Sequence, residues 1–213
     1  MRTRIVSSET THLGGRFLAA GFFCSWLLAI AGCGPTVQYK VGDQVFSSRE
    51  GAMQRIDQVN NDVLASIPPT ERPVHGTVTV AVPTLEQIKD KGVKWTGSTA
   101  QINQATMAEM VDYTGVTILK ALQFMGSAIE RRGIFDRVSR TEDPMPENLQ
   151  ADTCDFLIYY YLVNPEVQGW YVKGKGLSEP KPLIFETGKA LGVPRTVAWL
   201  DNLESVVLAA KTK

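Results

Sequence analysis

A helical pattern of unusual length, from Gln104 to Arg132, constrains the fold of this chain more than any other feature. Arg131 and Arg132 suit the negative end of the helix dipole, and Gly133 is a typical residue to end a helix. Gly115 allows either a kink or an earlier helix start. We therefore expect one long central helix. The apolar residues at helical spacing are Met107, Met110, Val111, Ile118, Leu122, Met125 and Ile129.

Several segments have the composition of β-strands. Residues 77–82 alternate and are β-branched, and residues 134–140 are typical of a half-buried strand. Residues 155–163 are continuously apolar or aromatic after the initial aspartate, as in a central strand. Residues 170–174 predict its antiparallel neighbour, and residues 183–186 predict another short strand.

The first folded element is expected to be a hairpin over residues 37–46, turning at Gly42. Ser47 followed by Glu50 has the spacing of a capping box, which predicts the start of a helix. This helix should end before Pro68, because proline restricts the residue that precedes it.

The C-terminal region predicts an extended segment followed by a helix. Residues 195–200 are interpreted as extended, and Asp201 with Glu204 forms a second capping box. A short helix is expected over residues 85–91. The resulting order of helices and strands predicts a single α+β domain with a mixed β-sheet and packed helices.

The N-terminal region has the features of an export signal. Residues 17–30 form an apolar run that follows three arginines. The run leads into Ile30-Ala31-Gly32-Cys33, and all four positions resemble the lipobox of bacterial lipoproteins. An ordinary signal peptide or a transmembrane anchor is the alternative, but the run is short of the ~20 residues that a spanning helix needs.

The lipobox resemblance implies that the chain is cut between Gly32 and Cys33 and that Cys33 is acylated. Residues 1–32 would then be a lipoprotein signal peptide, residues 33–40 a lipidated N-terminus and short tether, and residues 41–213 one globular domain. The lipid would bind the protein to a membrane. Because Gly34 stands where aspartate retains enteric lipoproteins in the inner membrane, the outer membrane facing the periplasm is favoured in a Gram-negative cell.

Counting cysteines and histidines excludes several kinds of site. Cys24 would leave with the signal peptide and Cys33 would carry lipid, so Cys154 alone remains, no intramolecular disulfide is expected, and a buried side chain is favoured for it. His75 is the only histidine outside the signal peptide, and we interpret it as a solvated loop residue. A catalytic triad and a His/Cys zinc site are therefore not expected, and no metal or other cofactor is predicted.

Other chemical motifs are weak. The paired carboxylates Glu142-Asp143 and Asp152 with Asp155 flank predicted strands, and we interpret them as solvated rather than catalytic. Residues 169–176 have phosphate-loop spacing but end in glycine where serine or threonine should bind magnesium. A strand that ends in a glycine turn explains them better.

The charge balance gives no case for nucleic acid. Residues 1–32 carry three of the 22 basic and one of the 22 acidic residues, which leaves a formal charge of −2 for the rest. Nucleic-acid binding needs a concentrated basic surface. No nucleic-acid partner is therefore predicted.

Residues 75–175 are similar in layout to the TolB amino-terminal domain and the curli-secretion lipoprotein family. The resemblance rests on the strand 78–82, the long helix, Arg132-Gly133-Ile134-Phe135-Asp136-Arg137-Val138, and the Ala-Asp-x-x-x-Phe-Leu pattern at 151–157. Residues 84–104 depart from it as an insert. The resemblance implies an assembly or partner-binding module and brings no catalytic residues.

The leading hypothesis is a lipid-anchored, non-enzymatic envelope protein that binds a protein partner or self-assembles. The alternative is a binding protein for a small lipid or glycan, with a pocket lined by Tyr160, Trp170 or Trp199. In the strand predicted over residues 155–163, Tyr159 and Tyr161 should face one side and Tyr160 the other. An enzyme that uses Asp152 or Asp155 ranks third.

Overall fold

A mixed five-stranded sheet forms the centre of the structure. The computed structural model describes residues 27–28, 36–92, 104–142, 154–162, 168–183 and 192–212. The order across the sheet is β6-β5-β7-β8-β9, with β5 parallel to β6 and β7, and with β7, β8 and β9 antiparallel in turn. The α+β class is confirmed. The strands are β5 (Val74–Ala81), β6 (Phe135–Thr141), β7 (Phe156–Leu162), β8 (Gln168–Gly174) and β9 (Lys181–Leu183).

Strand β7 occupies the middle of this sheet, as its continuous apolar composition predicts. Its first five residues are all buried, and they alternate between the main core and a small cluster on the other face. The antiparallel strand predicted after it is β8, which pairs along its whole length with β7. Strand β5 begins at Val74, three residues before the alternating pattern does. Of the strand predicted over residues 183–186, only Leu183 is described.

Helix α3 (Gln104–Arg132) has the predicted bounds. The predicted C-cap is also found, because Gly133 has φ of 69° and its N–H donates to the Glu130 carbonyl. Gly115 neither breaks the helix nor starts it. Instead, a Cβ atom at Gly115 would lie 2.9 Å from Cγ of Lys89, so this glycine allows the segment of α2 (Leu85–Gln87) and the π-helix Ile88–Gly92 to approach α3 closely.

The predicted C-terminal helix is found, but its predicted start at Asp201 was wrong. Residues 195–200 are helical rather than extended, because α4 runs from Val193 to Lys211 with Gly192 as N-cap and Pro194 in its first turn. Asp201 and Glu204 consequently lie inside the helix and do not cap it. The residues that explain the difference are spaced for a helix and buried on one face: Thr196, Trp199, Leu200, Leu203 and Val207.

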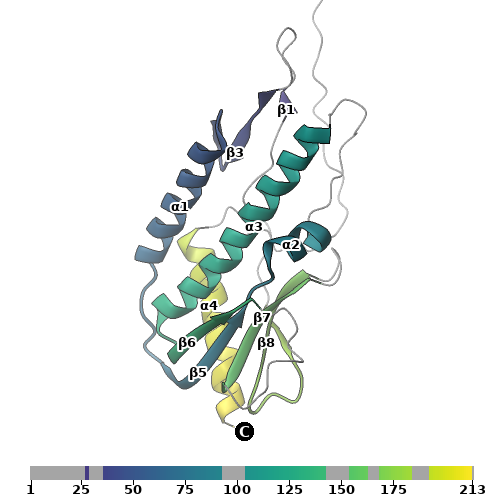
Figure 1. Ribbon diagram of the computed structural model, residues 1–213. Helices are drawn as coiled ribbons and strands as arrows, with labels where there is room; N and C mark the ends of the chain where they lie inside the picture. Colours follow the sequence, from purple (N-terminus) through teal and green to yellow (C-terminus); the bar gives the residue numbers. More distant parts are fainter. Residues whose placement is uncertain are drawn as a thin grey trace, which may run out of the picture.

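Helices α3 and α4 cover the same face of the sheet (Figure 1). Buried residues of both helices join side chains of β5, β7, β8 and β9 in the main hydrophobic core. On the other face, Leu157 and Tyr159 form a small buried cluster with Ala81, and Tyr171 packs against it. The sheet is therefore covered by helices on one side only among the described residues.

The N-terminal elements form an extension beyond the sheet. The hairpin is β3 (Tyr39–Val41) with β4 (Gln44–Phe46), and α1 (Arg49–Ala65) follows it alongside α3 (Figure 1). A separate cluster holds this extension together: Tyr39, Val41, Ala52, Ile56 and Tyr113.

The cap of α1 differs from the prediction by one residue. Ser48, not Ser47, is the N-cap, and its Oγ accepts a hydrogen bond of 3.2 Å from the Gly51 N–H. Glu50 lies in the first turn, where its negative charge interacts favourably with the positive end of the helix dipole.

Candidate functional site

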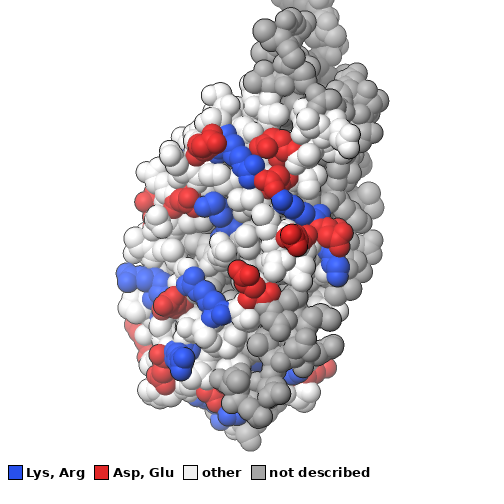
Figure 2. Space-filling view, in the orientation of Figure 1, with Lys and Arg blue, Asp and Glu red and all other residues white. Residues whose placement is uncertain are grey.

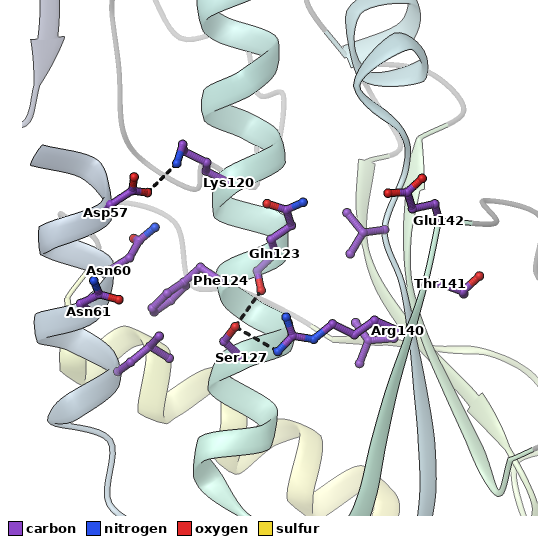
Figure 3. Close-up of a pocket in the computed structure, with 14 residues that line it drawn as sticks. Asp57, Asn60, Asn61, Lys120, Gln123, Phe124, Ser127, Arg140, Thr141 and Glu142 are labelled. Atoms are coloured by element: carbon purple, nitrogen blue, oxygen red, sulfur yellow. Dashed lines mark hydrogen bonds and ion pairs between the residues drawn. The ribbon is translucent and has the colours of Figure 1, made fainter. Parts of the chain in front are cut away.

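An open groove crosses α1, α3 and the carboxyl ends of β5 and β6. Its volume is about 840 Å³. Figure 3 shows α1 and the edge of the sheet on either side of α3, with side chains from all three reaching into the space between them. In sheets with parallel strands, ligand sites form preferentially beyond the carboxyl ends of the strands. The groove is therefore the candidate site.

The floor of the groove is apolar and its rim is polar. The apolar surface comes from Leu64 of α1, Phe124 of α3, Val80 of β5 and Val82, which directly follows β5. Phe124 is only partly buried, so part of its ring remains available. The polar lining comprises Asp57, Asn60, Asn61, Lys120, Gln123, Ser127, Arg140, Thr141 and Glu142.

The cations of the groove are already neutralised. Lys120 Nζ lies 2.6 Å from Oδ1 of Asp57, and this ion pair connects α3 to α1 (Figure 3). Arg140 reaches from β6 to α3, where its Nη2 lies 2.8 Å from Oε2 of Glu130 and donates to Ser127 Oγ at 3.1 Å. An anionic ligand would have to displace these partners.

Three carboxamides in the groove have no hydrogen-bond partner within the described part of the chain: Asn60, Asn61 and Gln123. Each can both donate and accept hydrogen bonds without carrying a charge. Together with the apolar floor, they suit a neutral polar chain such as an extended peptide backbone or a sugar.

Sequence reasoning did not identify these groove residues. They lie at helical spacings on one face of each helix: 57, 60, 61 and 64 on α1, and 120, 123, 124 and 127 on α3. A signal existed in Asn60-Asn61, because two adjacent asparagines inside a helix cost stability. Which helix faces adjoin each other could not be read from the sequence.

The predicted carboxylates divide between the groove and the opposite end of the sheet. Glu142 lines the groove and is exposed, whereas Asp143 and Asp152 lie outside the described residues. Asp155 lies before β7 and accepts hydrogen bonds from the N–H and Oγ1 of Thr77. The Thr77 N–H, helped by the Lys175 ammonium 3.1 Å away, lowers the pKa of Asp155 to about 2. This carboxylate therefore joins β5 to β7.

His75 is exposed, as predicted, although it belongs to β5 rather than a loop. Its Nδ1 lies 3.2 Å from Oδ1 of Asp136. The Gly76 N–H and the His75 ring together lower the pKa of the Asp136 carboxyl. Within the described ranges, no group of three or more histidine, cysteine, aspartate or glutamate side chains is arranged to hold a metal ion.

The aromatic residues proposed as a pocket fill the core instead. Tyr160, Trp170 and Trp199 are all buried, and the ring centroids lie 5.4 Å apart for the Tyr160–Trp170 pair and 5.8 Å apart for Trp170–Trp199. The predicted alternation is confirmed, because Tyr159 and Tyr161 both contact Tyr171 on the opposite face.

Two smaller predictions can be compared with the structure. Residues 169–174 belong to β8, and the chain then turns at Gly176 with φ of 82°, so the glycine-turn interpretation is confirmed. Cys154 is a free thiol that is only partly buried, which corrects the expectation of a buried side chain. It lies two residues before β7, outside the strand that enters the core.

The predicted lipidation and cleavage residues, Gly32 and Cys33, lie outside the described residues. Of the predicted signal peptide, only Leu27 and Leu28 are described, and they form a short strand, β1, paired with β2 (Thr36–Val37). No helix within the described ranges is both long and apolar enough to cross a membrane.

Acidic and basic side chains alternate over the face of the molecule in Figure 2. The described atoms of this face show no continuous area of one charge.

No family model, no curated protein and no solved structure matches the chain. The resemblance to the TolB and curli-secretion families therefore stays a prediction.

Proposed function

We propose that this protein is a lipid-anchored, non-enzymatic component of the bacterial cell envelope that binds a protein partner. The observation that carries the proposal is Ile30-Ala31-Gly32-Cys33 at the end of an apolar run. A lipid on Cys33 would hold the domain near a membrane, because the hairpin strand β3 already begins at Tyr39, a few residues after Cys33. The outer membrane facing the periplasm is the proposed location.

The groove supports the partner-binding part of the proposal. Its cations are paired, and the unpartnered carboxamides of Asn60, Asn61 and Gln123 can bond to peptide groups. The exposed part of Phe124 can contact an apolar side chain of the partner. A neutral glycan is the second candidate. Its hydroxyl groups can form hydrogen bonds with the carboxamides, and the apolar face of a sugar ring can pack against the aromatic ring of Phe124.

The anchor is tested by the intact mass of the protein extracted from native membranes. We expect the mass of residues 33–213 plus acyl chains. Cys33→Ser should move the protein from the membrane to the soluble fraction, whereas Cys154→Ser should leave it in the membrane. An uncleaved or unlipidated mass for the wild-type protein would overturn the anchor.

The groove is tested by a photo-crosslinking amino acid at Gln123 in cells. We expect a specific protein adduct from this position and none from Lys173, which is exposed on β8 and lies outside the groove. Asn60→Ala together with Asn61→Ala should abolish the adduct. Adducts of equal yield from both positions would contradict partner binding in the groove, and an adduct with glycan alone would support the second candidate.

A further inference from the structure

The two edges of the central sheet differ in their capacity to accept another strand. The edge strand β9 has three residues, and its Pro182 lacks an N–H group to donate. The opposite edge strand, β6, has seven residues and no proline, and its partner among the described strands is β5 alone. Asp136, Arg137, Ser139 and Arg140 of β6 are exposed. This edge is therefore accessible.

The hydrogen bonds to β5 determine which backbone groups of β6 point outward. The Val82 N–H donates to the Thr141 carbonyl at 3.0 Å, and Thr141 is in register with Ala81. Alternate residues of a strand direct their backbone groups to opposite sides, so Thr141 and Ser139 face β5. The N–H and C=O groups of Val138 and Arg140 consequently face away from the sheet.

We propose that the occupant of this edge is a second copy of the chain, which pairs antiparallel through β6 about a two-fold axis at Val138. This inference adds a second copy of the chain to the proposed partner binding, and the pairing itself does not require the lipid. Antiparallel pairing of two identical strands is always two-fold symmetric, so the register is set by the residue on the axis.

The charges on β6 determine which residue can lie on the two-fold axis. With Val138 on the axis, Asp136 stands opposite Arg140 of the second copy, and Arg137 stands opposite Ser139. Every neighbouring register places like charges opposite each other, which is destabilising. An axis at Arg137 or Arg140 pairs that arginine with itself, an axis at Asp136 pairs two aspartates, and an axis at Ser139 sets Asp136 against Glu142.

Charged residues on an edge strand commonly protect a sheet against aggregation. Asp136 and Arg140 would not only oppose edge pairing in general, because in one register their opposite charges face each other and favour it. Their side chains are 57% and 50% exposed, so both are accessible to a second copy. A pair of seven-residue strands is a small interface, and anchoring both copies in one membrane would raise their effective concentration.

The axis runs perpendicular to the sheet, so the two copies point in opposite directions along their strands. Both lipids can enter one membrane only if the sheet lies roughly parallel to that membrane. The proposed pairing therefore also predicts how the domain is oriented.

Single cysteines on β6 test the pairing and its register in the full chain. The background carries Cys24→Ser and Cys154→Ser and keeps Cys33, and this background alone should yield no disulfide-linked dimer in membranes. Val138→Cys should crosslink, because facing Cα atoms about 5.5 Å apart lie within disulfide range. Arg137→Cys and Ser139→Cys should each fail alone, because their copies would lie about 8 Å apart, but should crosslink when coexpressed.

The crosslinking outcomes separate this inference from the anchor. A crosslink through Arg137→Cys or Ser139→Cys alone would overturn the register, and no crosslink at any of these positions would overturn the pairing. Adding Cys33→Ser and repeating the experiment with concentrated soluble protein tests pairing without lipid. A crosslink there would show that the pairing does not need the lipid, whereas the anchor itself is refuted only by an uncleaved or unlipidated mass of the wild-type protein.

Charge reversal provides a second measurement on detergent-extracted protein. Arg140→Glu and Asp136→Lys should each raise the dimer dissociation constant about tenfold, because each places like charges opposite at two symmetric positions. The double variant should restore dimerisation, although it does not restore the bonds of Arg140 to α3 or of Asp136 to Gly76. Lack of restoration with native thermal stability would contradict the register.

Discussion

At the scale of single residues, Glu204 shows how a polar side chain acquires a role that its spacing does not reveal. Its side chain is 2% exposed and lies inside α4. Oε2 accepts a hydrogen bond of 2.8 Å from Thr70 Oγ1, and Oε1 lies 3.1 Å from Nε of Arg72. Arg132 at the end of α3 lies 3.7 Å from the same carboxylate. Glu204 thus connects α4 to the end of α3 and to the loop after α1.

We predict that Glu204→Ala lowers the free energy of unfolding by about 3 kcal/mol, because it leaves the largely buried Arg132 with less compensation and Thr70 without its acceptor. Urea denaturation at neutral pH measures this. Asp201→Ala is the matched control, since Asp201 pairs with the same arginine but is 52% exposed, and it should cost less than about 1 kcal/mol. Equal losses for both variants would contradict the role of Glu204.

At the scale of elements, the turn after β8 packs against the last turns of α4. Gly176 has φ of 82°, and a Cβ atom there would lie 1.9 Å from the Ala210 carbonyl oxygen. That oxygen belongs to the helix backbone, which cannot rotate away as a long side chain can. The end of α4 and this turn therefore fit only if residue 176 is glycine.

Gly176→Ala should destabilise the protein by about 3 kcal/mol or detach the C-terminal turn of α4, through the clash and the positive φ together. Thermal unfolding measures the first effect, and hydrogen exchange in residues 207–211 measures the second. Gly133→Ala isolates the backbone contribution, because Gly133 also has positive φ but open space around it. It should cost about 1 kcal/mol. Similar losses of stability for the two variants would mean that the end of α4 can move away from residue 176 without a free-energy cost.

At the scale of the whole molecule, the two larger of the three hydrophobic clusters contribute most to stability. The larger joins α3 and α4 to the sheet, and the smaller joins the hairpin and α1 to the first half of α3. Arg49 adds polar contacts to the smaller cluster through Glu109 and Asp112 of α3. Because α1 forms one wall of the groove, local opening of this extension would change the candidate site.

We predict that α1 and the hairpin exchange their amide hydrogens at a lower free energy than β5 and β7. Ile56→Ala should accelerate exchange in residues 39–65 and leave β7 protected, because Ile56 belongs to the smaller cluster. Ile158→Ala, in the main core, should lower protection everywhere. Hydrogen exchange with mass spectrometry distinguishes these patterns, and uniform acceleration by Ile56→Ala would show that the molecule unfolds as one unit.

The sequence by itself determined the elements whose local pattern is long or one-sided. Helix α3 follows from apolar residues repeated over its 29 residues and a glycine after it. Strand β7 follows from a run of apolar residues that only the middle of a sheet can bury. The lipobox resemblance is likewise local, but Cys33 lies outside the described residues, so the anchor stays a prediction.

Only the tertiary structure decided the features that depend on which surfaces of the helices and strands pack against each other. Residues 195–200 are β-branched and aromatic enough to suit a strand, yet they form the first turns of α4 because one face of that helix is buried in the core. Glu204, which has the spacing of a capping residue, instead meets Thr70, 134 positions away in the chain. The groove arises in the same way, since Asn60, Gln123 and Arg140 come together through helix packing, which local spacing does not encode.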